Sequence, residues 1–463
     1  MSSVGAPWRE SRALTRFFDI LSAMAKFSQT LIRLATAMIP VKSVRKRIRR
    51  RLMADARDAR VRALVPEVRA RYAAHERACR EKLAGGGRLR VAFLVCDASM
   101  FSGESVYMRM AADPRFDCFI AVAPRVTRGD EFLRSTLAKT TEGLRKKYGN
   151  AVRALYDPDT KVAAPIDADI VFSTVVYEDQ TLPDYTTERL SERSLVAVLY
   201  YGYGGLFISN EKKTPFLPNI VLSWRYFVSN EATRLMNVAK NPLLEANAVT
   251  VGYAKMDRLA SIPRREDGGK TILLCPHHTL DRIPGELALS TFLKNADLFQ
   301  RLPEMFPEIT FVFRPHPLLF PRLATDKWWG AEKTAAYEKK MEAHPNVVFQ
   351  RGGDYFEAFR NSDALIHDCG SFLAEYFYTG MPQCYLLEGE ATLREQFLPF
   401  AKTLAEHVRK AYTDEDVIGF IRDVAAGRDL DRDARAAFAA KEVCVNHPDA
   451  TAAVIAALGF DRR

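Results

Sequence analysis

An arginine and a histidine each stand before a proline in the tetrapeptide Arg314-Pro315-His316-Pro317. A residue that precedes proline is confined to extended backbone geometry, so the guanidinium and the imidazole are aimed at fixed points. Arginine can grip a phosphate group through two hydrogen bonds, and histidine can act as acid or base near neutral pH. The tetrapeptide therefore indicates a phosphate site with an acid–base group, the alternative being two side chains that cap a turn.

Two further polar clusters follow apolar runs of the chain. The first, which holds His277 and His278, follows TILLC, and the second, from His367 to Ser371, follows ALI, just as the tetrapeptide follows ITFVF. The carboxyl ends of strands in an open parallel sheet share one edge, where ligands bind. We therefore expect the three clusters to meet at one site, although a histidine pair in a surface loop needs no function.

The third cluster belongs to a stretch, 363–388, that predicts a phosphate cradle. Its apolar run turns through Gly370 into a segment of helical spacing that opens at Ser371. The free N–H groups at the start of a Ser-capped helix bind anions. Glu375 lies one turn after Ser371 on the same face, where it could accept hydrogen bonds from sugar hydroxyls or be solvated.

Metal binding is the competing use of the histidines. No HExxH or DxD-like spacing accompanies these histidines, so the sequence predicts neither a metal nor another cofactor.

The elements that must position these clusters alternate between β-prone apolar runs and helical patterns. This alternation predicts two doubly wound parallel sheets, hence two Rossmann-like domains that face a cleft. We place an N-terminal, acceptor-side domain at 88–262 and a C-terminal, donor-nucleotide domain at 263–463, joined by a charged, glycine-bearing linker at 263–270.

In the first domain the run Leu195–Tyr200 leads directly into Tyr201, Gly202 and Tyr203. Glycine at the carboxyl end of a strand lets the backbone approach a ligand closely. We expect an acceptor-side loop here, and a plain tight turn is the alternative.

The first 87 residues predict a helical, basic arm. Large apolar residues recur at helical spacing from Leu14 to Ile39, and a polybasic cluster follows between Lys42 and Arg51. An amphipathic helix beside a polybasic cluster is the arrangement expected at an anionic membrane surface. The alternative is a helix that packs on the protein's own body and carries a solvated basic tail.

Charge and cysteine content narrow the class of protein. Of the formal charge of +10, residues 1–90 carry +15, from 22 Lys and Arg against 7 Asp and Glu, so the rest of the chain is acidic. This distribution disfavours a nucleic-acid-binding surface spread over the fold.

The seven cysteines are scattered without CxxC spacing, which indicates a reducing compartment. Charged residues interrupt the N-terminal apolar stretch, so no signal peptide is expected, and no uncharged run is long enough for a membrane span.

Several stretches between about 195 and 425 resemble the CDP-glycerol glycerophosphotransferases, the teichoic acid polymerase family. RPHP at 314–317 and SDALIHDCGS at 362–371 are similar to its Arg-x-His-Pro and Ser-Asp-x-x-x-x-Asp-Tyr-Ser-Ser elements, and GYAKMDRL at 252–259 and AYTDEDVIGFI at 411–421 resemble two further elements. The resemblance implies a GT-B fold.

The resemblance also implies site roles. His316 would be a catalytic or phosphate-contacting histidine with Arg314 beside it, and Asp368 and Ser371 would lie at the donor phosphates, where we also place Gly370, Glu375 and His278. The chain departs from the family at Cys369 and Gly370, where Tyr and Ser are usual, and at Tyr201, where a His-Gly element is expected.

These observations predict a cytoplasmic transferase, peripheral on the inner face of the cell membrane. It would move glycerol phosphate or a related polyol phosphate from a CDP-activated donor to a lipid-linked cell-surface polysaccharide, of the capsule or teichoic acid kind, and release CMP. The alternatives are a GT-B glycosyltransferase that uses a nucleotide sugar, and a non-catalytic nucleotide- or polymer-binding scaffold of a capsule assembly complex, which the missing histidine favours.

Overall fold

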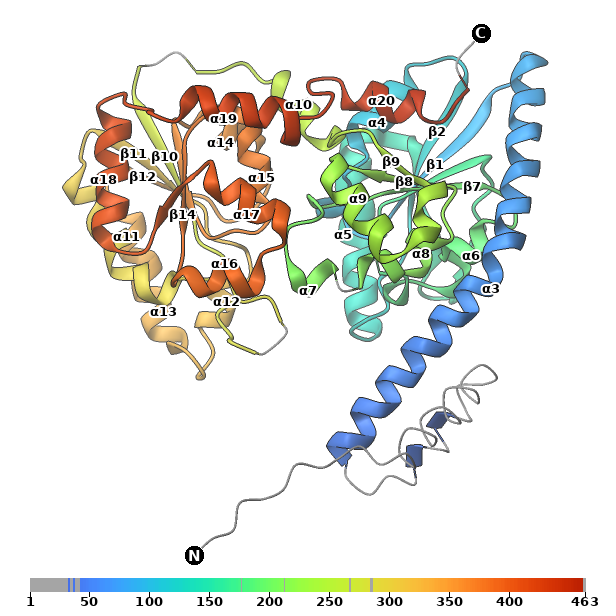
Figure 1. The fold of residues 1–463 in the computed structure, drawn as a ribbon, viewed down its shortest axis with the longest axis horizontal. Helices are drawn as coiled ribbons and strands as arrows, with labels where there is room; N and C mark the ends of the chain where they lie inside the picture. Colours follow the sequence, from blue (N-terminus) through green and yellow to red (C-terminus); the bar gives the residue numbers. More distant parts are fainter. Residues whose placement is uncertain are drawn as a thin grey trace, which may run out of the picture. The chain divides into compact units, whose positions relative to one another are not determined.

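The computed structural model describes residues 32–33, 36–37, 42–175, 177–211, 213–265, 268–283 and 286–460 (Figure 1). The chain divides into two compact units, Met1–Ala74 and His75–Arg463. The predicted amphipathic stretch Leu14–Ile39 lies almost entirely outside the described residues.

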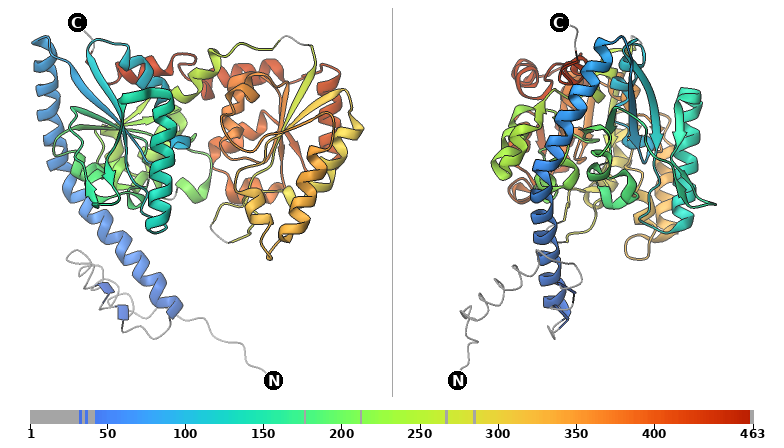
Figure 2. Two further views of the ribbon diagram at one scale, coloured as in Figure 1. Left: turned by 180° about the vertical axis from the view of Figure 1, so that it is seen from behind. Right: turned by 90° about the vertical axis from the view of Figure 1, so that its right-hand side faces the viewer.

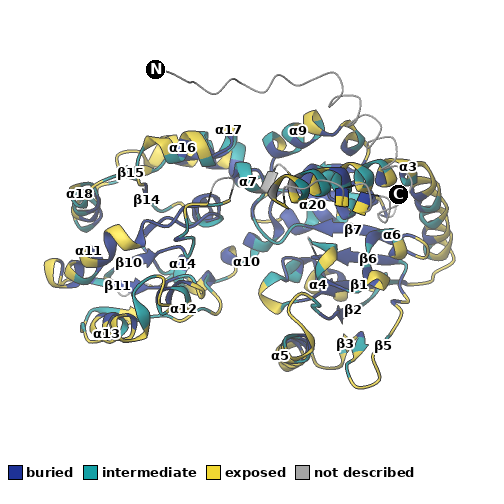
Figure 3. Cartoon of the chain, turned by 90° about the horizontal axis from the view of Figure 1, so that it is seen from below, coloured by how far each residue is buried: buried dark blue, intermediate teal, exposed yellow. Residues whose placement is uncertain are grey.

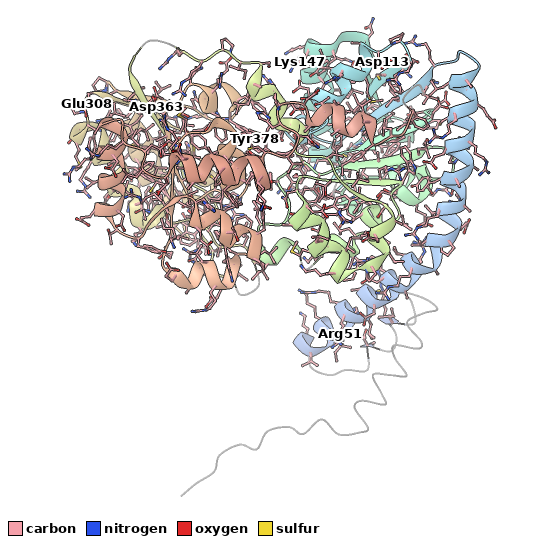
Figure 4. The ribbon with its side chains drawn as sticks, turned by 45° about the horizontal axis from the view of Figure 1, so that its top comes forward. Arg51, Asp113, Lys147, Glu308, Asp363 and Tyr378 are labelled. Carbon is pink, nitrogen blue, oxygen red and sulfur yellow. The ribbon has the colours of Figure 1, made fainter. Side chains whose placement is uncertain are left out.

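A long helix, α3 (Lys42–Ala84), begins at the polybasic cluster and lies within the predicted helical arm. Arg51, labelled in Figure 4, is exposed on it. The last turns belong to the second unit, where Glu76 accepts the indole N–H of Trp224 at 2.9 Å and Lys82 pairs with Asp169 at 2.7 Å. Within the described segments, each helix is too short or too polar to cross a membrane.

The first sheet is wholly parallel and has the order β3-β2-β1-β6-β7-β8-β9. Its strands, most of them apolar runs buried on both faces, are β1 (Leu89–Val95), β2 (Phe116–Val122), β3 (Val152–Ala154), β6 (Ile170–Ser173), β7 (Leu195–Leu199), β8 (Arg225–Val228) and β9 (Ala248–Thr250). A small antiparallel pair, β4 (Tyr156–Asp157) and β5 (Val162–Ala163), follows β3.

Helices connect these strands and cover the sheet, with exposed residues on their outer faces (Figures 1 and 3). They are α4 (Glu104–Ala111), α5 (Asp130–Tyr148), α6 (Thr187–Leu190), α7 (Ile208–Glu211), α8 (Pro218–Val221), α9 (Glu231–Lys240) and α10 (Asp257–Ala260).

The second sheet is also parallel, in the order β12-β11-β10-β13-β14-β15. It lies in the yellow-to-red half of the ribbon in Figure 2. Its strands are β10 (Lys270–Cys275), β11 (Ile309–Phe313), β12 (Val347–Phe349), β13 (Ala364–His367), β14 (Gln383–Leu386) and β15 (Arg409–Ala411). Asp363, labelled in Figure 4, joins the start of β13 to β10 by accepting the Thr271 N–H at 2.9 Å.

The helices that follow β10 in the chain are α11 (Phe292–Met305), α12 (Leu319–Leu323), α13 (Gly330–Glu342), α14 (Phe356–Arg360), α15 (Phe372–Glu375), α16 (Glu390–Gln396), α17 (Pro399–Glu406), α18 (Asp414–Ala425), α19 (Arg432–Phe438) and α20 (Ala450–Ala456). The last of them, α20, packs against α4 of the first sheet. Asp257 holds the start of α20 against the first domain, because its carboxylate accepts the N–H groups of Ala450 and Thr451, at 3.2 and 2.7 Å.

The predicted fold class is confirmed: two parallel, Rossmann-like sheets form the body, because apolar strand runs alternate with helices. Two predicted elements differ in extent. The helical pattern of residues 286–306 predicts one long helix, but α11 begins only at Phe292. The segment after Ser371 is one α turn (α15) followed by a 3₁₀ turn that ends at Gly380. The predicted domain boundaries at 87 and 262 stay predictions.

Candidate active site

A cavity of about 550 Å³ lies between the two Rossmann-like domains. The first domain lines it with the turn after β1, the start of α4, and two cationic side chains, Lys255 and Arg258. The second domain contributes the Arg314–Pro317 segment and the loop Gly352–Phe356. Its volume is within the range of pockets that hold small ligands and cofactors.

The strand register explains how residues distant in sequence reach this cavity. Leu274 pairs with Phe313 across β10 and β11, and Cys275 pairs with His367 across β10 and β13. The three polar clusters therefore leave their strands at the same level of one sheet edge. The structure brings the three clusters into contact with one another.

Arg314 extends from the end of β11 and is 8% exposed. Its Nη1 donates to the side-chain oxygen of Gln350 at 2.9 Å and its Nη2 donates to the Gly353 carbonyl. Burial lowers the pKa of the guanidinium from its ordinary value. Because a guanidinium has five N–H donors, Arg314 is fixed by this loop and retains further donors for an anion.

His316 is held in one tautomer by its own turn. Its Nδ1 accepts the backbone N–H of Leu318 at 3.1 Å, so the neutral ring carries its proton on Nε2. Burial, with the nearby Arg322 charge, lowers the pKa of His316 to about 4. At neutral pH His316 is therefore an uncharged N–H donor.

His277 and His278, at the end of β10, lie against His316. The His278 and His316 ring centroids are 4.0 Å apart, and those of His277 and His316 are 5.3 Å apart. Burial and His316 lower the pKa of His278 to about 3, and burial together with the other two rings lowers the pKa of His277 well below its ordinary value. The structure thus brings these histidines together, as the sequence predicts, and shows in addition that the cluster is neutral.

Asp368 lies behind this cluster, fully buried. Its carboxylate accepts the backbone N–H groups of His277 and Thr291, each at 2.5 Å, and the Thr291 hydroxyl at 2.9 Å. Burial raises the pKa of Asp368 to about 6, although these hydrogen bonds act in the opposite direction. Asp368 thus fixes the histidine loop and the start of α11, and it is not among the cavity-lining residues described.

Gly370 and Ser371 face the first domain. A Cβ at Gly370 would lie 2.9 Å from the Phe207 ring, so the glycine is a packing requirement. Ser371 has helical backbone angles and its side chain caps no helix N–H, contrary to the expected Ser cap. Its Oγ would lie 3.4 Å from a Cβ at Gly202, so the loop after β7 meets the third polar cluster.

Glu375 is 1% exposed and bonded to tyrosines. Its carboxylate accepts the hydroxyl of Tyr355 at 2.6 Å and that of Tyr253 at 3.3 Å, while Lys255 Nζ lies 3.9 Å away. These contacts place Glu375 behind the cavity wall, where it orients Tyr355 and Lys255 of that wall.

The predicted acceptor-side loop is anchored rather than open. The Tyr201 carbonyl accepts the Tyr253 hydroxyl at 2.9 Å, and the Tyr203 hydroxyl donates to the Val443 carbonyl at 3.1 Å. Among the described residues, Tyr201, Gly202 and Tyr203 do not line the cavity.

The wall from the first domain contains functional candidates that the sequence reasoning missed. Arg258 bridges the cleft, since its guanidinium pairs with Asp354 across it and lies 3.8 Å from Glu104 on its own side. Glu104 also binds Tyr148 and Lys147, and Figure 4 labels Lys147. The GYAKMDRL stretch, which holds both Lys255 and Arg258, was the available signal.

Two Rossmann-like domains with a ligand-sized cavity between them define the GT-B fold, and solved structures share it. The chain is similar to the wall teichoic acid polymerase TagF, with a TM-score of 0.55 and 14% identity over 80% of this chain and 88% of that one. A TagF variant from a CDPG soak has a TM-score of 0.52, with 13% identity over 80% and 87%. The UDP-GlcNAc 2-epimerase of Neisseria meningitidis, bound to UDP-GlcNAc, has a TM-score of 0.49, with 11% identity over 81% and 100%.

No protein-family model matches the chain, and no curated protein matches it by sequence. The likeness to the solved structures shows the fold.

Proposed function

We propose that this protein is a membrane-surface transferase that moves glycerol phosphate, or a related polyol phosphate, from a CDP-activated donor to a cell-surface polysaccharide or teichoic-acid-like polymer and releases CMP. The proposal combines the GT-B fold, the resemblance of the RPHP and SDALIHDCGS stretches, and the chemistry of the cavity.

One observation carries the proposal: cationic and neutral N–H donors from both domains line the same cavity. Arg314 and His316 come from the second domain, and Lys255 and Arg258 come from the first. A nucleoside diphosphate ester has two negative charges to neutralise, and transfer at its β-phosphorus depends on positioning and charge stabilisation. The cavity offers both.

In the proposed reaction an acceptor hydroxyl attacks the β-phosphorus and the bond to the CMP oxygen breaks. Arg314 and Lys255 stabilise the charge on the phosphoryl oxygens. His316 donates its Nε2 hydrogen to one of them, because its Nδ1 is occupied by the Leu318 N–H. This arrangement assigns phosphate contact to His316 and leaves proton removal to another group.

We propose Glu104 as the group that takes the acceptor proton. It is a cavity-lining carboxylate of the first domain, the same domain that holds Tyr201, where the family's His-Gly element is expected. Arg258, Lys147 and Tyr148 orient it. Replacement by glutamine keeps the size of the side chain and removes the base, so Glu104→Gln should lower kcat by roughly 100-fold and leave donor binding in place.

The direct test is a donor screen across CDP-polyols and UDP-sugars, read by nucleotide release in the presence of a polymer acceptor. We expect CMP release from CDP-glycerol or a close relative, and a large loss of it in His316→Ala. Release of UDP from a nucleotide sugar alone would favour the glycosyltransferase alternative. Tight CDP-glycerol binding without turnover would favour the scaffold, which the absence of a histidine among the described first-domain lining residues supports.

The membrane part of the proposal rests on the basic arm. The first turns of α3 carry exposed basic side chains, Lys42, Lys46, Arg50 and Arg51 among them. Such a cluster attracts anionic lipids, and the attraction weakens as salt rises. The full chain should sediment with anionic liposomes and not with neutral ones, and deletion of residues 1–52 should abolish sedimentation; equal sedimentation after the deletion would contradict the assignment.

A further inference from the structure

Three imidazole rings from two neighbouring strand ends converge beside the cavity. His277, His278 and His316 each offer a ring nitrogen, and these nitrogens all lie within 4.8 Å of one another. Among the described residues this is the group of histidine, cysteine and acidic side chains whose geometry fits a metal ion. His316 lines the cavity, whereas His277 and His278 are not among its lining residues, so the group lies at the edge of the cavity and meets it through His316.

The hydrogen bonds of the group leave ligand atoms available. His277 Nδ1 contacts the Thr279 hydroxyl at 2.9 Å, which fixes the ring and leaves Nε2 for another partner. The Nδ1 atom of His278 is buried and has no hydrogen-bond partner within the described structure. A buried polar atom without a partner is costly and often marks a site that a ligand completes.

The backbone of the group is held rigidly. Asp368 accepts the His277 N–H at 2.5 Å, and Arg322 donates to the His278 carbonyl at 3.4 Å. Pro315 and Pro317, which flank His316, restrict the backbone conformation of its segment. A loop fixed on both sides positions the three rings before any ligand arrives.

We propose that His277, His278 and His316 bind one divalent transition ion of the zinc class, with a fourth coordination position open to the cavity. Neutral imidazole nitrogen is a preferred ligand of such ions, and three histidines with an open position is the ligand set of catalytic rather than structural zinc sites. Bonds of about 2.0–2.1 Å require the three nitrogens to approach to about 3.3 Å, which small ring rotations supply.

Two features oppose the ion and set its affinity below that of a closed structural site. The Arg322 guanidinium is close, and its charge is only partly balanced by Asp281, 3.7 Å away. The Leu318 N–H also holds the Nδ1 atom of His316, so coordination by this ring competes with that hydrogen bond. A bound ion would act as a Lewis acid toward an oxygen of a ligand in the cavity.

The test is cobalt(II) titration of tag-free, chelator-treated full-length protein, followed by visible absorption and calorimetry. We expect saturation at one equivalent with d–d bands of a four-coordinate ion, and displacement by zinc. His278→Gln and His316→Gln should each weaken binding by roughly 100-fold, while the matched control His407→Gln, outside the cavity, should bind as the parent does.

Absence of saturable binding, or equal binding by the parent and the His278→Gln variant, would overturn the site. His278 is the deciding position because it is only partly buried, and circular dichroism verifies that the variant is folded. The titration uses no nucleotide, so its outcome is independent of the proposed transferase reaction.

Discussion

The two walls of the cavity differ in how their residues are arranged along the chain. The second-domain wall is built from polar clusters that directly follow apolar strands, and its Arg314 and His316 stand two residues apart. The first-domain wall combines the turn after β1, the start of α4 and two cations about 150 residues later, Lys255 and Arg258. Sequence motifs therefore identify only the second-domain wall of the site, because the packing of the two domains assembles the opposing wall.

The largest effect should come from the second-domain wall. Arg314→Lys removes the planar, two-pronged grip on a phosphate, and His316→Ala removes the Nε2 donor. We expect each to lower kcat/KM for nucleotide release by roughly 100- to 1,000-fold. The exposed Arg394→Ala on α16 should have no effect, and turnover in His316→Ala equal to that of the parent would remove His316 from the mechanism.

The first-domain wall should contribute a smaller effect that falls mainly on donor binding. Lys255→Met removes a cation that lies 3.9 Å from Glu375 and 5.1 Å from the Tyr355 ring centre. We expect kcat/KM to fall by roughly 10- to 100-fold, chiefly through KM, with partial recovery in Lys255→Arg. The exposed Lys139→Met on α5 is the matched control; a loss confined to kcat would assign Lys255 to the chemical step instead.

The contact between the two domains at Gly370 and Phe207 can be tested by adding a methyl group at the glycine. Gly370→Ala would place a methyl group 2.9 Å from the Phe207 ring, and we expect a loss of about 1–3 kcal/mol in the free energy of unfolding. Urea denaturation measures it. Phe207→Leu should restore part of the loss in the double variant, and Gly143→Ala, in an open position of α5, should not destabilise the protein.

The smallest effect should be a pH dependence of stability from the histidine cluster. The pKa values of His278 and His316, about 3 and about 4, lie below the ordinary 6.5, so the unfolded chain binds more protons as pH falls. Stability that is fully present above pH 6.5 is then lost toward acid, by about 1 kcal/mol per histidine between pH 7 and pH 5 after allowance for partial exposure. Denaturation curves of the parent should show this slope, and the His278→Gln, His316→Gln double variant should flatten it. An unchanged slope would mean that the rings titrate normally in the folded state.

The sequence by itself determined the two parallel sheets and one wall of the site. Runs such as TILLC and ITFVF are strands because they are apolar on both faces, and the residues that follow a parallel strand must lie at the ligand-binding edge. For that reason Arg314 and His316 were identified from the sequence and line the cavity.

Only the tertiary structure decided the roles of their neighbours. In the structure Asp368 fixes the histidine loop, Gly370 packs against Phe207 and Glu375 binds two tyrosines, contacts that the sequence did not indicate. Their predicted contact with the donor stays a prediction. Lys255 and Arg258 became part of the site only because the segment that follows β9 lines the cavity between the two domains. Chemical type and spacing are local properties of a chain, whereas burial and partners depend on contacts between residues a hundred or more positions apart.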